Sequence, residues 1–220
     1  EIRTPLNGII GFTELLLKSP LPRQQRDHLS TIRKSSEILL TIINDILDFS
    51  KIEAGEATVE ESEFDVSEAV RACAAMVEVR AQEKRVQVAH YLSASLPRLR
   101  ADELHVKQIV LNLLSNAVKF SDGGGSVWIG ATMIGDGSMA ISVRDDGPGI
   151  APEHIPRITE RFYRVGSDRG RKTGGTGLGL AIVKHVLNAH KARLLIESEL
   201  GDGSVFTCAF PSERTRRKSD

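Results

Sequence analysis

The sequence predicts an α+β fold in two parts. The first is an antiparallel helical hairpin that pairs with a second copy into a four-helix bundle, and the second is a larger domain with helices on one face of a mixed sheet. Three observations lead to this prediction: two heptad patterns in the first 50 residues, a change to mixed helical and strand patterns after residue 65, and three glycine-bearing turns in the second part.

The first heptad pattern lies in residues 2–17, where positions four and three apart hold Ile2, Leu6, Ile9, Thr13 and Leu16. The stretch 19–22, Ser-Pro-Leu-Pro, ends this helix, and Pro22 suits the first turn of the next one. A second heptad pattern follows from Arg23, with Leu, Ile, Ser, Leu, Ile, Ile and Ser at 29, 32, 36, 39, 43, 46 and 50, and it ends at Gly55.

The two helices carry more apolar surface than one hairpin can bury. Besides its seam, the second helix has apolar residues at 40, 42, 47 and 49, which widen its apolar stripe. Two hairpins packed as a four-helix bundle would bury these faces. We therefore expect a homodimer formed through residues 1–57.

The second part begins after a polar, acidic boundary at 58–64, and we place its domain at residues 62–212. Periodicity predicts helices at 65–82, 102–118 and 178–189, and strands at 86–92, 127–132 and 139–143. A closing hairpin follows, with strands at 194–198 and 205–210 around Gly201-Asp202-Gly203. The basic run in 213–220 is expected to be a solvated tail.

Composition argues against several kinds of function. The 220 residues carry 29 basic and 29 acidic side chains, so neither nucleic acid nor an anionic membrane surface is expected as a partner. Cys73 and Cys208 lie in apolar segments and are expected to be small buried residues, not a disulfide or a metal site. No apolar run reaches the roughly 18–20 residues of a membrane span, so no membrane contact is expected within the chain.

Asp145-Asp-Gly-Pro-Gly follows a predicted strand and makes a tight turn. Gly147 and Gly149 would let the backbone approach a flat ligand closely. The Asp145 carboxylate could accept a hydrogen bond from an exocyclic amine. A plain surface turn accounts for these residues equally well.

A second glycine-rich stretch, residues 174–179, opens a predicted helix. The free N–H groups and the dipole of a helix N-terminus make a phosphate site. A similar spacing occurs in dinucleotide-binding folds, but there it follows the first strand of a βαβ unit. Here it comes after a long loop near the end of the chain, which argues against a dinucleotide fold.

Asn112, Asn116 and Lys119 are spaced four and three apart, so one helix face carries them all. Amide oxygens suit a hard cation such as Mg²⁺, and a lysine suits phosphate oxygens. The alternative is an amphipathic helix with its polar residues in solvent. The apolar residues between them indicate a mostly buried helix, in which two asparagine side chains need partners.

With these motifs in this order, the chain resembles the two-component sensor histidine kinases over almost its whole length. Residues 1–6 resemble the block after the phosphoacceptor histidine, and residues 111–120 resemble the asparagine box. The stretches 145–149, 175–179 and 201–203 resemble the three glycine boxes, and Arg161-Phe162-Tyr163 resembles the phenylalanine box of the nucleotide lid. One such box is weak support, whereas five in order are specific.

The resemblance implies the ATP-binding α/β sandwich shared with gyrase- and chaperone-type ATPases, with ATP as substrate, ADP as product and Mg²⁺ as cofactor. It implies that Asp145 reads the adenine amine, that Asn116 with Asn112 holds Mg²⁺, and that Lys119 contacts phosphate. Residues 151–175 would be the mobile lid. The other implied ATP contacts are Gly147, Gly149, Ile150, Phe162, Tyr163, Arg164, Thr176, Gly177, Leu178, Gly179 and Leu180.

Asn112 helps to choose between related families. The relatives that hydrolyse ATP are expected to carry a glutamate four positions before the magnesium asparagine, as a base for the attacking water. Asparagine is a poor base, so water attack should be slow and the γ-phosphoryl group is left for a protein acceptor. Such a transfer needs mainly positioning and charge neutralisation.

The family's acceptor histidine would immediately precede Glu1, and none of the six histidines in the chain lies in that context. All six are expected to be surface or packing residues: His28, His90, His105, His154, His185 and His190. The chain as given is thus expected to bind nucleotide without phosphorylating itself. By the resemblance, Glu1 would take the proton of the attacking histidine, and Thr4 would orient a water that dephosphorylates a receiver domain.

The leading hypothesis is a cytoplasmic histidine-kinase core that passes the ATP γ-phosphoryl group to a histidine and then to an aspartate of a response-regulator receiver domain. The missing histidine favours a second one, a nucleotide-binding dimer scaffold or phosphatase without autokinase activity. A third, an ATP hydrolase, has Asn112 and the heptad hairpin against it. An upstream membrane anchor is common in the family but has no support in these residues.

Overall fold

The computed structural model describes residues 2–53, 59–165 and 176–216. They form two compact units: a helical unit of residues up to 56, with which Thr176 is also grouped, and a mixed unit of helices and strands that begins at residue 57. The two predicted parts of the chain are therefore both present, and the α+β fold class is confirmed.

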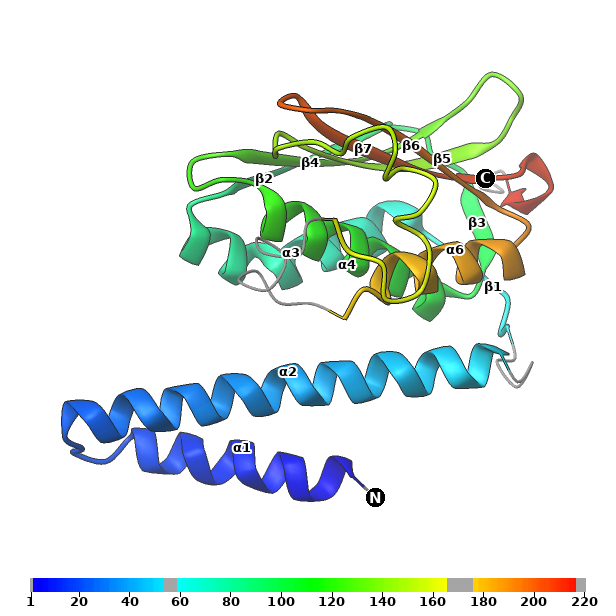
Figure 1. The fold of residues 1–220 in the computed structure, drawn as a ribbon. Helices are drawn as coiled ribbons and strands as arrows, with labels where there is room; N and C mark the ends of the chain where they lie inside the picture. Colours follow the sequence, from blue (N-terminus) through cyan, green and yellow to red (C-terminus); the bar gives the residue numbers. More distant parts are fainter. Residues whose placement is uncertain (1, 54–58, 166–175, 217–220) are drawn as a thin grey trace. The chain divides into compact units, whose positions relative to one another are not determined.

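The helical unit is a hairpin of α1 (Arg3–Leu17) and α2 (Arg23–Glu53), which run antiparallel and side by side (Figure 1). The connection between them contains residues 19–22, where the sequence predicts the first helix to end. The Arg26 guanidinium reaches back from α2 and donates to the carbonyls of Leu17 at 3.1 Å and Ser19 at 3.4 Å, which covers groups that a helix C-terminus leaves open. The expected stop of the second helix at Gly55 lies outside the described residues.

The heptad seams are only partly buried within one hairpin. In α1, Leu6 and Thr13 are buried, and the Thr13 hydroxyl donates to the Ile9 carbonyl at 2.9 Å. The other seam residues of α1, Ile2, Ile9 and Leu16, remain 44–62% exposed. Three seam residues of α2 are likewise exposed: Ile32, Leu39 and Ile46. An apolar face is therefore left open on the hairpin.

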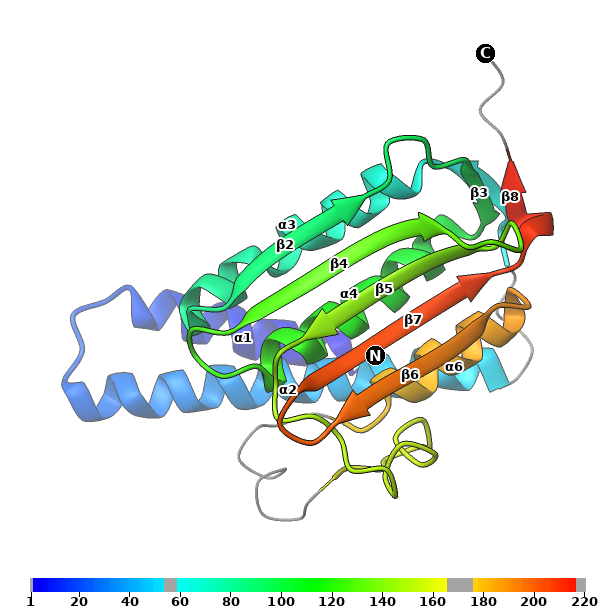
Figure 2. The same ribbon diagram turned by 90° about the horizontal axis from the view of Figure 1, so that it is seen from above.

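The mixed unit contains a five-stranded sheet in the order β2-β4-β5-β7-β6, covered on one face by three helices (Figures 1 and 2). β2 and β4 are parallel and the other neighbours are antiparallel. The predicted helices and strands occur, with bounds that differ only at the ends. The elements are α3 (Val66–Lys84), β2 (Gln87–Leu92), α4 (Glu103–Phe120), β4 (Ser126–Met133), β5 (Met139–Asp145), α6 (Gly179–Ala189), β6 (Arg193–Glu199) and β7 (Gly203–Phe210).

A second, small sheet was not expected from the sequence. It consists of β1 (Ser62–Phe64), β3 (Arg98–Ala101) and β8 (Thr215–Arg216) in the order β1-β3-β8, with a short 3₁₀ helix, η1 (Ser212–Arg214), before β8. The prediction of a solvated tail is therefore wrong for residues 213–216. The Arg214 guanidinium lies 3.0 Å from the Glu61 carboxylate and donates to the Arg100 carbonyl at 2.9 Å. Residues 217–220 lie outside the described part.

Several buried polar or reactive groups of the mixed unit have structural roles. Both cysteines are buried and unpaired, as expected, and burial raises the pKa of Cys73 to about 11 and that of Cys208 to about 12. Neither is therefore a reactive thiolate. His190 is fully buried, with Nδ1 donating to the Val186 carbonyl at 2.8 Å and Nε2 accepting the Asp102 N–H at 3.1 Å. His190 is thus a packing residue, as predicted.

Within the described part of the chain, no helix combines the length and the apolar character that crossing a membrane requires.

Candidate functional site

Two glycines mark where the segments predicted to bind a ligand meet. A Cβ at Gly179 would lie 3.0 Å from the side-chain oxygen of Asn112, and a Cβ at Gly147 would lie 3.1 Å from the Phe120 carbonyl. These close approaches bring α4, the turn after β5 and the N-terminus of α6 together. The asparagine motif and the first two glycine-rich motifs, which are far apart in sequence, therefore form one site.

Asp145 ends β5 and is 5% exposed. Its Oδ1 accepts the Gly147 N–H at 3.0 Å. Burial raises the pKa of the carboxyl group, while the Gly147 N–H acts in the opposite direction. The start of β7 lies directly against this residue, because a Cβ at Gly203, where φ is +91°, would collide with the Asp145 carbonyl. The first and third glycine-bearing turns are thus in contact, and glycine is required at 203.

The turn that follows Asp145 is held by the β6–β7 hairpin. The Ser198 hydroxyl accepts the Ile150 N–H at 2.8 Å and lies 2.7 Å from the Gly203 carbonyl, to which it donates. Gly149 has a φ of +68°, and a Cβ there would collide with the Glu199 carbonyl. Ser198 was not predicted as part of the site, since Ile150 is 48 residues away in sequence and a serine in a strand gives no local signal.

Asn112, Asn116 and Lys119 are each half-buried on α4, spaced so that one face carries all three. Burial lowers the pKa of Lys119, and the positive charges of Arg164 and Lys84 lower it further. A cation among other cations in a partly buried place is stabilised by an anionic ligand. This face of α4 therefore suits a ligand that carries negative charge.

The N-terminus of α6 completes this arrangement. Leu178, at the N-cap position, is buried and has no side-chain group that could cap the helix. Gly177 precedes it with a φ of +73°, and Thr176 and Leu180 are half-buried on either side. Helix N-termini present N–H groups and the positive end of the dipole, which favours an anion.

Residues 151–165, the first part of the predicted lid, form a series of turns. The His154 Nδ1 atom lies 2.7 Å from the Tyr163 hydroxyl, and the Arg157 guanidinium lies 4.3 Å from the centre of the Tyr163 ring. The Phe162 N–H donates to the Gly177 carbonyl at 3.0 Å. The predicted phenylalanine box thus contacts the second glycine box. Residues 166–175, the rest of the predicted lid, lie outside the described residues.

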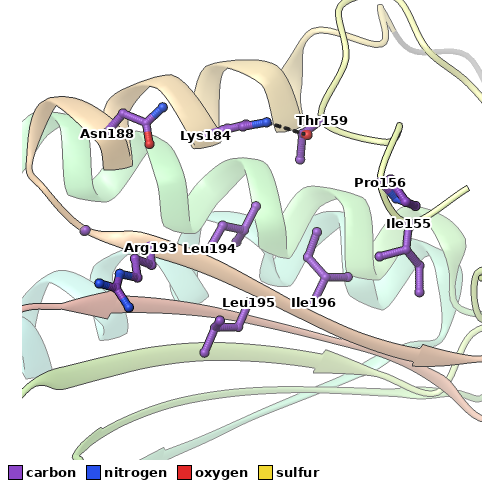
Figure 3. A pocket seen from close by; sticks show the side chains of 10 residues that line it. Ile155, Pro156, Thr159, Lys184, Asn188, Arg193, Leu194, Leu195 and Ile196 are labelled. Carbon is purple, nitrogen blue, oxygen red and sulfur yellow. Dashed lines mark hydrogen bonds between the residues drawn. The ribbon is translucent and has the colours of Figure 1, made fainter. Parts of the chain in front are cut away.

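A separate groove of about 420 Å³ lies between α6, β6 and residues 155–159 (Figure 3). Ile155, Leu194 and Ile196 give it apolar walls, and at its edge the Lys184 ammonium donates to the Thr159 hydroxyl at 3.4 Å. None of the predicted site residues lines this groove. It is therefore distinct from the place where Asn112 meets α6.

Of the two residues predicted to act on the hairpin, the structure describes only Thr4, which belongs to the helical unit. Thr4 is exposed in the first turn of α1. Glu1 lies outside the described residues.

The side chains on α4 that could hold a metal ion are amides. The described residues contain no group of three or more His, Cys, Asp or Glu side chains that could hold one. Asn112 and Asn116 instead offer amide oxygens beside a glycine that leaves space over Asn112. Two such oxygens fit Mg²⁺, which keeps several waters and takes phosphate oxygens as further ligands.

Comparison with known proteins agrees with this arrangement. Residues 101–214 match the family described as histidine kinase-, DNA gyrase B-, and HSP90-like ATPase, and residues 1–55 match the His Kinase A (phospho-acceptor) domain. An uncharacterized sensor-like histidine kinase of Rhizobium meliloti is 37% identical over 97% of this chain and 41% of its own length. The sensor protein GacS of Pseudomonas syringae is 36% identical over 100% of this chain and 25% of its own length. The chain thus spans less than half the length of these relatives.

Two solved structures show the same fold. Full-length ShkA in complex with AMPPNP is 36% identical, with a TM-score of 0.80 over 100% of this chain and 45% of ShkA. The mycobacterial sensor histidine kinase MprB is 27% identical, with a TM-score of 0.59 over 71% of this chain and 99% of MprB. Since the phosphoacceptor and ATPase families are matched in succession along one chain, this chain belongs to the two-component sensor histidine kinases.

Proposed function

We propose that this chain is the catalytic core of a sensor histidine kinase, which transfers the γ-phosphoryl group of ATP to a histidine on its first helix and then to an aspartate of a response regulator. The meeting of Asn112 with Gly179, and of the Asp145 turn with the end of α4, carries the proposal. ShkA, similar over the whole of this chain, has a structure in complex with AMPPNP, which supports a nucleotide at this site.

The adenine base would lie on the turn after β5. The Asp145 carboxylate would accept a hydrogen bond from the exocyclic amine of the base. Gly147 and Gly149 keep the backbone bare, so that a flat ring can lie against it, and Ile150 would add an apolar contact. The hydrogen bonds from Gly147 to Asp145 and from Ile150 to Ser198 hold this surface in place before the ligand arrives.

The phosphates would lie between α4 and the N-terminus of α6. Lys119 would bind phosphate oxygens, and the amides from Gly177 to Leu180, with the Thr176 hydroxyl, would bind the others. The lid residues Phe162, Tyr163 and Arg164 would cover the nucleotide. Asn116 and Asn112 would hold Mg²⁺, which neutralises phosphate charge when it is bound.

The same site explains why phosphoryl transfer is favoured over hydrolysis. Asn112 stands where a hydrolase would need a carboxylate base, and an amide does not take a proton from water. In the transfer, the bond between the γ-phosphorus and the β,γ-bridging oxygen breaks, a phosphorus–nitrogen bond forms to histidine, and Glu1 takes the proton from the ring. ADP leaves, and the receiver aspartate then accepts the phosphoryl group.

The hairpin would bind the partner proteins. The exposed seam residues of α1 and α2 fit a second copy of the hairpin, so that a homodimer forms through residues 1–57. A receiver domain would dock on the same unit, where Thr4 would orient the water that dephosphorylates it. Replacing Thr4 by alanine should slow that dephosphorylation, and an unchanged rate would remove this role. The site of action would be the cytoplasm, where ATP is available.

The test places one histidine before Glu1 and incubates both versions with Mg²⁺ and γ-labelled ATP. We expect acid-labile, base-stable label only in the version with the added histidine, and its loss in Asp145→Ala. If neither version is labelled although both bind nucleotide, the autokinase proposal fails. The chain would then be a nucleotide-binding scaffold or a phosphatase.

A further inference from the structure

Lys84, the last residue of α3, reaches across to the end of α4. Its ammonium group donates to three backbone carbonyls, those of Val118 at 3.1 Å, Lys119 at 2.5 Å and Ser121 at 2.6 Å. An ammonium group has three N–H donors, and each has one of these acceptors. Lys84 therefore caps the C-terminus of α4 from a different helix.

The acceptors of Lys84 are groups that α4 cannot satisfy itself. The last carbonyls of a helix have no partner within it. The Ala117 carbonyl accepts both the backbone N–H of Ser121 at 2.9 Å and its hydroxyl at 2.8 Å. The next two carbonyls along the helix, those of Val118 and Lys119, are the ones that Lys84 reaches.

The connection from α3 to β2 fixes the position of this lysine. Arg85 has a φ of +60° and ends α3, and its carbonyl accepts the Gly124 N–H at 2.9 Å. The Gln87 N–H then donates to the Gly125 carbonyl at 2.9 Å. The backbone beside Lys84 is thus bound to the loop that follows α4, and its side chain binds the Ser121 carbonyl at the start of this loop.

This end of α4 lies beside the proposed nucleotide. Lys119 is in its last turn, and the Phe120 carbonyl approaches Gly147. A helix C-terminus carries about half a negative charge, which would repel a phosphate. The Lys84 ammonium sits on that negative end, and it also holds the carbonyl of Lys119 itself.

We propose that Lys84 is a positioning residue of the nucleotide site, which offsets the negative end of α4 and fixes Lys119 for the phosphates. The inference rests on the proposed function and deepens it. It assigns a role at the phosphate end of the site to a residue outside every motif that the sequence analysis singled out.

The test compares the dissociation constants of ATP and of adenosine, which lacks phosphates, for Lys84→Met, Lys84→Arg and the wild type. Titrations are made at one salt concentration, with adenosine followed by competition. Lys107→Met is the matched control, since this lysine lies on α4 itself and pairs with Glu103 at 2.6 Å near the other end of the helix.

Lys84→Met should weaken ATP binding about five- to tenfold, as expected for losing a charge at a helix end, and adenosine binding less than about twofold. Lys84→Arg keeps the charge and should stay within about threefold of the wild type, and Lys107→Met should bind like the wild type. If Lys84→Met does not fold, Lys84→Gln, which removes the charge but keeps two N–H donors, should show the same selective loss.

Equal weakening of ATP and adenosine would show a purely structural lysine and overturn the assignment, as would unchanged ATP binding in a folded variant without the charge. A wild-type chain that binds no ATP is a different result. It would overturn the proposed function itself, and the role of Lys84 with it.

Discussion

The mixed unit and the hairpin differ in how much apolar surface each buries alone. In the mixed unit, three helices cover the sheet, and Leu114, Ile129 and Val183 are inaccessible to solvent. Among the described side chains of the hairpin, only Leu6, Thr13 and Ser36 are buried, and two of these are polar. We therefore expect the mixed unit to hold its fold as a monomer and the hairpin to pair with a second copy. Dimerisation and nucleotide binding are thus predicted to lie in different units.

The geometry of α1 indicates which of its faces the second copy contacts. Nine residues at 3.6 per turn make two and a half turns, so Leu15 lies opposite the buried Leu6, whereas Ile9 lies on the neighbouring flank. Both Ile9 and Leu15 are exposed in the single hairpin. Only the flank of Ile9 continues the face that is already buried, so we expect the second copy there.

The largest effect is expected at a glycine of the mixed unit. Gly149→Ala places a side chain at a φ of +68° and against the Glu199 carbonyl. It should lower the free energy of unfolding by about 3 kcal/mol or more and weaken ATP binding at least about tenfold. Urea unfolding and nucleotide titration measure both. Gly135→Ala, where a Cβ meets nothing within 4 Å, is the control and should change stability by less than about 0.5 kcal/mol.

The next effect concerns the open face of the hairpin. Ile9→Lys should weaken the dimer about 100-fold, or roughly 3 kcal/mol, because a charge would be buried between the copies. Leu15→Lys should leave the dimer intact. Sedimentation at several protein concentrations measures this, and the ATP affinity should be the same in both variants. A dimer that survives Ile9→Lys would place the interface elsewhere.

Lowering the pH should reduce the folding stability of the mixed unit more than that of the hairpin. Burial lowers the pKa of His190 below the 6.5 of an ordinary histidine, whereas His28, in the hairpin, is exposed. Below about pH 6.5 the unfolded chain therefore binds a proton that the folded unit does not. Stability is lost as the pH falls from there to the folded pKa, by up to about 1.4 kcal/mol per pH unit.

Unfolding measured between pH 7.5 and 5 should thus show a shallower slope in His190→Asn than in the wild type. His28→Asn, which removes an exposed histidine of the hairpin, is the matched control, and the slope should change more in His190→Asn than in His28→Asn. The ionisable groups near His190 are Asp102, His105, Arg214 and Glu61. An identical slope in His190→Asn and the wild type would show that other groups cause the acid sensitivity.

The smallest expected effect is an increase in stability. A Cβ at Gly8, in the interior of α1, meets nothing within 4 Å. Gly8→Ala should therefore stabilise the hairpin by about 0.5–1 kcal/mol, since alanine favours the helix. Thermal unfolding at fixed protein concentration measures this. A destabilised hairpin would mean that the partner copy packs against Gly8.

Much of the fold follows from local patterns. The heptads predict the hairpin, and the periodicity predicts the helices and the long strands to within their ends. The strands of the small sheet were missed, because β1, β3 and β8 are too short to show an alternation. Arg214 was misread as part of a tail, since its partners Glu61 and Arg100 are 153 and 114 residues away in sequence.

The residues of the site, too, were predicted only where they form a local motif. Its glycines and its α4 residues are visible as motifs, and the structure brings Asn112 and Asp145 into one site with the glycine turns. Their roles with ATP and Mg²⁺ remain predictions. Ser198 and Lys84 were not found, because each acts through backbone groups of another element. A serine or lysine of that kind has no spacing that marks it.

The small sheet has a consequence for how the mixed unit is connected to the rest of a protein. β1 and β8, its first and last strands, both pair with β3, and Arg214 joins the last segment to Glu61 beside the first. The two chain ends of the unit therefore leave from one corner. A force or a fused domain acting on either end meets this three-stranded sheet first, before the five-stranded sheet that carries Asp145. Both connections of the mixed unit to neighbouring parts of a protein therefore lie on the same side.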